Sequence, residues 1–184
     1  MIMPGVDYNP LEMRILAIVM AAAALVAAQA PADPKLEAQL RRIFPDAVSF
    51  SPKGGEPPHF KVFKKDPAGG APVLAGLAFW TTELDPLERG YDGPIKILVG
   101  MDTAGLLVGV LVVDHHEPYG YFSVDPPEFA AQFKGKSIRD QFRLGADVDA
   151  VSRATMTVGS ASRAVRNSSR RVATQLLTPP KPKP

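Results

Sequence analysis

Residues 95–113 read IKILVGMDTAGLLVGVLVV, two apolar runs separated by a short polar turn. The runs at 95–101 and 106–113 are dense in Ile, Leu and Val, a composition typical of β-strands. The turn between them ends in Gly105, and glycine readily adopts the positive φ that hairpin turns often require. Because both faces of the runs are apolar, we expect a buried hairpin at the centre of a sheet.

A second hairpin is predicted upstream of this one. Residues 59–65 alternate loosely between apolar and polar side chains, as a strand with one face in water does. A glycine-rich turn at 66–71 leads into a second apolar run at 72–81, in which Trp80 is expected to belong to the core. Residues 51–58 are rich in Pro and Gly and are expected to form a loop.

Helices are predicted on both sides of these hairpins in the sequence. Residues 34–43 have apolar side chains at helical spacing and are followed by Pro45, which ends the helix. Residues 126–133 begin with two prolines, as helices often do, and 136–142 are expected to add another helical turn. A last helix is expected from Thr157 onward. The sequence therefore predicts an α+β domain, with helices packed on one face of an antiparallel sheet of two hairpins.

The N-terminal residues indicate export from the cytoplasm. Residues 15–28 form an alanine-rich apolar block that follows Arg14, and small residues follow at 28–32. The block is shorter than the ~20 residues that span a bilayer comfortably. We expect residues 1–32 to be a signal peptide, or an uncleaved anchor, that places the protein in the periplasm or another extracytoplasmic space. The domain is expected at 33–177, and 178–184 are expected to be a disordered tail of Pro and Lys.

Composition narrows the chemistry open to this domain. The 184 residues include no cysteine, which excludes disulfides, iron–sulfur clusters, thiolate zinc sites and cysteine nucleophiles held by this chain. The net charge of +2, without an aromatic and basic stripe, gives no support for nucleic-acid binding. The sequence has no nucleophile elbow, phosphate-binding P-loop, dinucleotide fingerprint or HExxH motif. Redox chemistry would therefore need a cofactor that binds without a thiolate.

Residues 149–155, DAVSRAT, precede the last predicted helix. A helix start offers unpaired backbone N–H groups and a favourable dipole to an anion, so a phosphate on Thr155 would be well placed. Ala154 keeps the surroundings small, and Ser152 and Thr157 supply further hydroxyl groups. No neighbouring base is evident in the sequence to activate Thr155. A separate transferase would therefore have to attach any group there.

This segment resembles the Asp-x-x-Ser/Thr-Gly-Ala-Thr/Ser acceptor motif of the FMN-binding domain family. The family includes Rnf-complex G subunits, the C subunit of Na⁺-translocating NADH:quinone reductase and the periplasmic part of NosR/NirI-type regulators. The resemblance implies that Thr155 carries FMN through a phosphodiester bond. It places Asp149, Ser152, Ala154 and Thr157 around the cofactor. Arg153 stands where the family usually has glycine, and its guanidinium is able to pair with the phosphate.

Two upstream segments strengthen the resemblance, which extends over roughly residues 90–172. Gly90-Tyr91-Asp92-Gly93 is similar to the Gly-Tyr-x-Gly entry of the family, and His116-Glu117-Pro118 is similar to its His-x-Glu-Thr/Pro segment. The second segment looks closer to the NosR-type branch than to the Rnf type. The resemblance implies cofactor contacts from Tyr91, Gly93, His116, Glu117 and Pro118.

The residues themselves leave alternatives open. His116 and Glu117 either line a flavin pocket or brace a loop. Tyr91, Tyr119 and Tyr121 either flank an isoalloxazine ring or pack at hairpin ends. His115 and His116 are adjacent and would point to opposite faces of a strand, so no metal site is expected. The arginines near the C-terminus are expected to form a solvated helix face or to dock a partner at its rim: Arg163, Arg166, Arg170 and Arg171.

The hypothesis from sequence is an exported electron-transfer flavoprotein rather than an enzyme with its own substrate. It would receive FMN from a flavin transferase and exchange electrons with a membrane or periplasmic redox partner, as in anaerobic respiration. One alternative is a regulatory module of the same fold that binds no flavin or binds it noncovalently. Another is a flavin-dependent periplasmic reductase.

Overall fold

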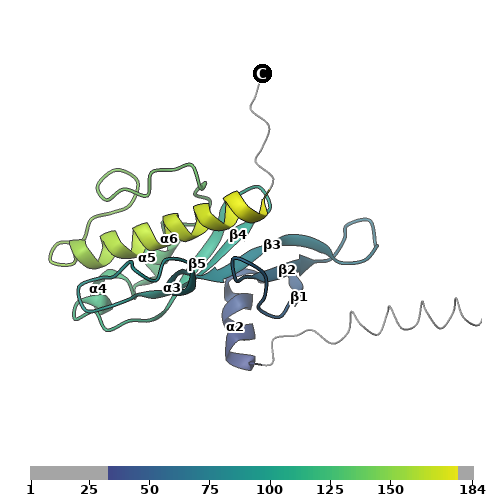
Figure 1. Ribbon diagram of the computed structural model, residues 1–184, viewed down its shortest axis with the longest axis horizontal. Coiled ribbons are helices and arrows are strands. Elements are labelled where there is room, and N and C mark those ends of the chain that lie inside the picture. Colours follow the sequence, from purple (N-terminus) through teal and green to yellow (C-terminus); the bar gives the residue numbers. More distant parts are fainter. Residues whose placement is uncertain (1–32, 178–184) are drawn as a thin grey trace, which may run out of the picture. The chain divides into compact units, whose positions relative to one another are not determined.

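The computed structural model describes residues 33–177; the predicted signal segment 1–32 and the predicted tail 178–184 lie outside the described residues. The described chain forms an α+β domain, as the sequence predicts (Figure 1). Its elements are, in chain order, α2 (Pro34–Ile43), β1 (Ala47–Phe50), β2 (Phe60–Lys64), β3 (Val73–Trp80), α3 (Thr81–Leu84), β4 (Lys96–Asp102), β5 (Leu107–Asp114), α4 (Gly120–Ser123), α5 (Pro127–Ala131) and α6 (Thr155–Leu176).

The five strands form one antiparallel sheet in the order β1-β2-β3-β4-β5. Both predicted hairpins are confirmed, since β2 pairs with β3 and β4 pairs with β5. Gly105 in the second turn has a φ of 84°, the conformation expected of a glycine there. Strand β1 was not predicted, because four residues with only the two end positions buried carry no clear alternation.

The expectation that the 95–113 hairpin lies at the centre of the sheet is wrong for one of its strands. β4 lies between β3 and β5, whereas β5 forms the edge. Residues 135–138 cover part of that edge, where the N–H of Leu107 donates to the carbonyl of Lys136 at 2.8 Å and Gly135 donates back to Leu107 at 2.8 Å. This cover explains why an edge strand is so apolar. It also replaces the helical turn predicted at 136–142, since this backbone bonds to the strand instead.

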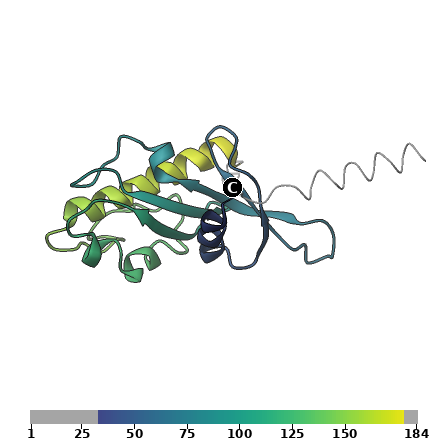
Figure 2. The same ribbon diagram turned by 90° about the horizontal axis from the view of Figure 1, so that it is seen from below.

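Helices cover both faces of the sheet, not one face as predicted (Figures 1 and 2). Alternate residues of a strand point to opposite faces, so β4 contributes Ile97 and Val99 to one core and Leu98 to the other. The first core contains α5 and the buried side of α6, including Val158. The second core contains the buried side of α2 and also Trp80, which confirms its core position.

Helices α2 and α6 match the helices predicted from the sequence, except for the residue at which α6 begins. The bounds predicted for α2 are confirmed, and Asp33 caps its first turn. The apolar positions predicted for α6, such as Val165 and Val172, are buried. However, α6 begins at Thr155 instead of Thr157, so Thr155 is its first residue. None of the helices within 33–177 combines the length and the apolar character needed to cross a bilayer.

Candidate functional site

Thr155 opens a 22-residue helix whose first turn lacks a side-chain cap. The residue at the N-cap position is Ala154, and a methyl group cannot accept a hydrogen bond from the backbone N–H groups that follow. The Thr155 side chain is exposed, and its hydroxyl contacts only the carbonyl oxygen of Val151, at 3.4 Å. The helix start therefore combines an accessible hydroxyl with N–H groups and a dipole that favour an anion.

The chain reaches this helix start through a left-handed residue. Arg153 has a φ of 67°, a conformation that glycine adopts freely and that other L-residues adopt at a cost of about 1–2 kcal/mol. This backbone angle gives a physical reason for glycine at the corresponding position of the acceptor motif. The Arg153 side chain is exposed, as are those of Asp149 and Ser152. The backbone N–H of Asp149 donates to the Gln132 side chain at 2.7 Å, which anchors the loop before the turn.

The buried carboxylate of Glu117 joins two of the segments on which the family resemblance depends, 90–93 and 116–118, to the first turn of α6. It accepts hydrogen bonds from the backbone N–H of Tyr91 at 3.0 Å and of Asp92 at 2.9 Å, and the hydroxyl of Thr157 donates to it from the first turn of α6. A side chain at Gly90 would clash with this carboxylate, because a Cβ there would lie 2.7 Å from Glu117 Cδ. Glu117 is therefore placed to brace the loop and the helix start.

Gly93 and the histidines complete the same region. Gly93 has a φ of 119°, and its carbonyl accepts from the N–H of Gly90 at 2.7 Å, which closes the 90–93 turn. His115 lies between Asp125, 2.8 Å from its Nε2, and the N–H of Glu117, which donates to its Nδ1 at 3.1 Å. His116 and Pro118 are exposed beside this network. No three His, Asp or Glu side chains of the described chain gather as metal ligands would.

The three tyrosines near this region point into solvent more than into a pocket. Tyr91 is 71% exposed and Tyr121 is 70% exposed. The rings of Tyr119 and Tyr121 contact Phe122, with centroids 5.5 and 4.9 Å apart. Phe122 is their near neighbour in α4, so these contacts are local to that segment and do not show packing at a hairpin end.

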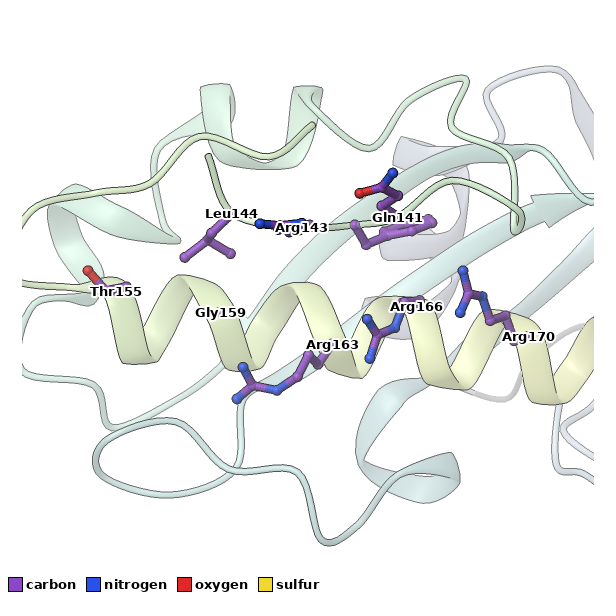
Figure 3. A pocket seen from close by; sticks show the side chains of 9 residues that line it. Gln141, Arg143, Leu144, Thr155, Gly159, Arg163, Arg166 and Arg170 are labelled. Atoms are coloured by element: carbon purple, nitrogen blue, oxygen red, sulfur yellow. The ribbon is translucent and has the colours of Figure 1, made fainter. Parts of the chain in front are cut away.

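A groove of about 570 Å³ begins at Thr155 and follows α6 toward its C-terminal end (Figure 3). One wall is a face of the helix, and the other is the loop 141–144. The helix contributes Thr155, Gly159, Arg163, Arg166 and Arg170. These positions follow at intervals of four, four, three and four residues, a spacing that places them on one face. The groove was not predicted from the sequence, although the spacing of these residues is a visible signal for its helical wall.

The loop that forms the second wall is held by Asp147. Its carboxylate accepts from the N–H groups of Phe142 and Arg143 at 3.0 and 2.6 Å, and Lys136 lies 3.3 Å away. Desolvation raises the pKa of Asp147, but the two backbone hydrogen bonds and Lys136 outweigh it, so the pKa lies below the usual 3.8. Phe142 has a φ of 53° and a buried ring, which turns the loop across the groove.

The arginines of α6 are not simply a solvated helix face, as one alternative predicted. Arg163 pairs with Glu88 at 2.8 Å, and this hydrogen bond raises the pKa of the guanidinium. Arg170 donates to the carbonyl oxygens of Ile138 and Asp140, both at 2.8 Å. Arg171 donates to the carbonyl of Leu84 at 2.9 Å. These side chains therefore tie the helix to the neighbouring loops.

An exposed hydroxyl at an uncapped helix start, opening onto a groove lined by arginines, defines an α+β domain suited to hold an anionic cofactor. Comparison with known families identifies it more closely. Residues 90–170 match the FMN-binding domain, so this part of the chain is similar to the FMN-binding domain family.

The relatives found by comparison are G subunits of the ion-translocating oxidoreductase complex. The protein from Photorhabdus laumondii is 36% identical over 121 residues, 60% of this chain and 53% of the relative. The protein from Vibrio vulnificus is 32% identical over 88 residues, 42% of each chain. The protein from Haemophilus influenzae is 43% identical over 47 residues, 26% of this chain and 21% of the relative. The matches thus span about half or less of these relatives, and they do not test the expected closeness to the NosR branch.

The geometry around Thr155 fits FMN. The exposed hydroxyl and the free N–H groups suit a phosphate, and the arginines supply positive charge. Gly159, one turn along, leaves the groove open beside the apolar Leu144, since a Cβ there would lie 3.7 Å from Leu144 Cδ2 and 3.2 Å from Arg163 Nη1. The space that a side chain would fill is available to a ligand attached at Thr155.

Proposed function

We propose that this chain carries FMN, joined through its phosphate to the hydroxyl oxygen of Thr155, and relays electrons to or from a membrane or periplasmic respiratory partner. The observation that carries the proposal is the position of Thr155. It has an exposed hydroxyl at the uncapped first residue of a long helix, within the region that matches the FMN-binding domain. Bound FMN supplies the capacity to accept and release electrons, while the protein positions the cofactor and tunes it.

The protein does not activate Thr155 for this attachment. Within residues 33–177, the hydroxyl contacts a backbone carbonyl and no carboxylate or imidazole. We therefore assign the reaction to a separate flavin transferase. In that reaction the Thr155 oxygen forms a bond to the FMN phosphorus of a phosphoanhydride in which FMN is joined to a second phosphate group. The anhydride bond breaks, the second phosphate leaves with the electron pair of that bond, and the hydroxyl proton passes to a base or to solvent. The net gain for the protein is one FMN less one water.

Among the other predicted site residues, we assign some to the phosphate and others to the positions of the 90–93 loop and the start of α6. In this proposal Arg153 and the first N–H groups of α6 stabilise the negative charge of the phosphodiester. Glu117, Gly93 and Thr157 keep the loop and the helix start in position. Export through residues 1–32 completes the proposal, because it would bring the domain to the compartment of the proposed partner.

The relatives support an electron relay rather than an enzyme with its own substrate. Their names describe parts of an ion-translocating oxidoreductase complex, and the matched region here includes the whole candidate site. The described residues also have no cysteine to hold further redox centres. We therefore infer that the electrons come from and go to other proteins of a membrane redox complex.

Intact mass measures the attachment directly. The chain is expressed with a flavin transferase, and the wild type is expected to gain the mass of one FMN less water. Thr155→Ala should abolish the gain, whereas Thr155→Ser retains a hydroxyl and should restore it. Thr174→Ala is the matched control, because Thr174 is also an exposed threonine of α6 but lies outside the acceptor motif, and it should leave the gain intact. Absence of any mass gain in the wild type would exclude the covalent function.

Noncovalent binding gives a different result in the same experiment. A yellow protein without a mass gain, whose visible absorption is lost from the chain on denaturation, would replace the covalent proposal with a noncovalent one. A colourless wild type would instead favour the regulatory module without flavin.

A further inference from the structure

A cationic surface lies along the later turns of α6, away from Thr155. It is formed by two arginines of the helix and two of the facing segment 138–144: Arg139, Arg143, Arg166 and Arg170. Figure 3 shows three of them along the groove, Arg143 on the loop and the other two on the helix. Arg139 is exposed, and it lies between the two residues whose carbonyl oxygens accept hydrogen bonds from Arg170. We call these four residues the arginine surface.

The positive charge of the arginine surface is not neutralised within residues 33–177. None of its four side chains takes part in an ion pair there. Arg166 donates to an amide oxygen at 3.1 Å and Arg170 donates to backbone carbonyls, so both guanidinium groups keep their full charge. The nearby carboxylate of Asp147 is paired with Lys136, and Asp140 offsets only part of the charge. The surface therefore has an excess of positive charge that attracts anions.

The proposed phosphodiester does not account for this charge. It would carry a single negative charge at Thr155, where the start of α6 and Arg153 meet it. Arg166 and Arg170 lie about 16 and 22 Å farther along the helix, at the rise of an α-helix. Surface charges that far apart are largely screened from each other at physiological ionic strength. The arginine surface is thus available to a different anion.

The chemistry and shape of the surface fit the carboxylates of a protein better than a bilayer. A guanidinium binds a carboxylate through two parallel hydrogen bonds, and arginine is enriched at protein interfaces. The surface borders a groove, which admits a projecting chain segment but not a flat bilayer. Among residues 33–177, the exposed large apolar side chains that could enter a bilayer lie outside 138–144 and outside α6 beyond Met156.

We propose that the arginine surface docks an acidic segment of the redox partner, whose Asp or Glu side chains pair with Arg143 and Arg166 on the two walls of the groove. The inference rests on the proposed function, because that function requires a partner that approaches the cofactor. Thr155 and Arg166 line the same groove, so docking there brings the partner toward the attachment residue. Attraction between opposite charges also speeds the association of the two proteins.

Fluorescence anisotropy of a short labelled polyglutamate peptide measures this docking on the full chain. The Arg143→Gln/Arg166→Gln double variant is expected to bind the peptide about fivefold more weakly than the wild type, because two exposed ion pairs are lost. Neither side chain bonds to another helix or loop within 33–177, unlike Arg170, so the fold should be unchanged. Arg42→Gln/Arg89→Gln is the matched control, because it removes the same charge from two exposed arginines elsewhere and should retain the wild-type affinity.

Two results would overturn the proposal. Equal weakening in both double variants would show that the peptide responds to net charge alone. A wild type that does not bind the peptide would exclude an acidic segment, and binding of phosphatidylglycerol vesicles in its place would assign the surface to a membrane. Failure of the proposed function is distinct, because it appears as a missing FMN mass, and the peptide measurement on the unmodified chain still tests the arginine surface.

Discussion

The two sides of the first turn of α6 differ in what their side chains contact. On one side Thr157 is buried and bonded to Glu117, which also holds the 90–93 loop. On the other side Thr155 is exposed and opens onto the groove. Two hydroxyls in the first turn of α6 thus have different surroundings, one fixed within a network and one accessible. The comparison teaches that one helix start can present a side chain that holds the local structure and, two residues away, a side chain open to solvent.

The largest effect is expected on the buried side. Glu117→Ala should lower the free energy of unfolding by about 3 kcal/mol, because it leaves two backbone N–H groups and the Thr157 hydroxyl without their partner. Thr155→Ala should change it by less than about 0.5 kcal/mol in protein without flavin. Urea denaturation measures the free energy of unfolding of both variants. Equal decreases in the two variants would show that Thr155 and Thr157 do not differ in their surroundings as described.

A smaller effect on the free energy of unfolding is expected at Asp147, which holds the loop that forms one wall of the groove. Asp147→Asn should lower the stability at pH 7 by about 1.5 kcal/mol, since two N–H groups and Lys136 would lose a charged acceptor. The pKa of Asp147 is lower in the folded state than its usual 3.8, so this stabilisation is complete above about pH 4 and is lost as the pH falls through the folded pKa. The difference in free energy of unfolding between the wild type and Asp147→Asn should therefore decrease as the pH falls.

Denaturation between pH 2 and pH 7 measures this narrowing. Asp46→Asn is the matched control, because Asp46 is an exposed aspartate whose carboxylate makes no hydrogen bond within the described chain. A gap that stays constant down to pH 2 would show that Asp147 does not titrate as inferred.

The smallest effect on the free energy of unfolding is expected at Arg153, the residue with a left-handed backbone just before α6. Arg153→Gly should raise the free energy of unfolding by roughly 0.5–1 kcal/mol, because relief of the backbone strain exceeds the added entropy of the unfolded chain. Arg89→Gly, at an exposed arginine without a positive φ, should have the opposite sign. Chemical denaturation measures the free energy of unfolding of both variants. A lower free energy of unfolding in Arg153→Gly than in the wild type would argue against strain at this residue.

Much of the fold could be predicted because long elements carry strong local signals. The 95–113 hairpin and α2 were recognisable from composition and spacing alone. The edge position of β5 was not, because its cover comes from residues 135–138, which bond to it through backbone groups that leave no pattern in the sequence. The four-residue helices α3 and α4 are too short to show a period.

Part of the site could be predicted because its motifs are visible as residue types at a fixed spacing in the sequence. The 149–155 motif and its two companion segments were visible as residue types in order. The structure brings the two companion segments together with the first turn of α6 at Glu117. What each residue does there was not visible. Whether Glu117 braces a loop or lines a pocket depends on burial, and the wall that Arg143 adds to the groove depends on how the loop folds over α6.

The alanine at the start of α6 has a consequence for how the protein matures. A serine or aspartate at that position would stabilise the helix by about 1 kcal/mol, and the chain forgoes that stabilisation with Ala154. A phosphodiester at Thr155 presents oxygen acceptors to the same N–H groups, so the cofactor itself would serve as the missing cap. Attachment of FMN would then complete the folding of the first turn, and the loaded protein should resist proteolysis there better than the unloaded one.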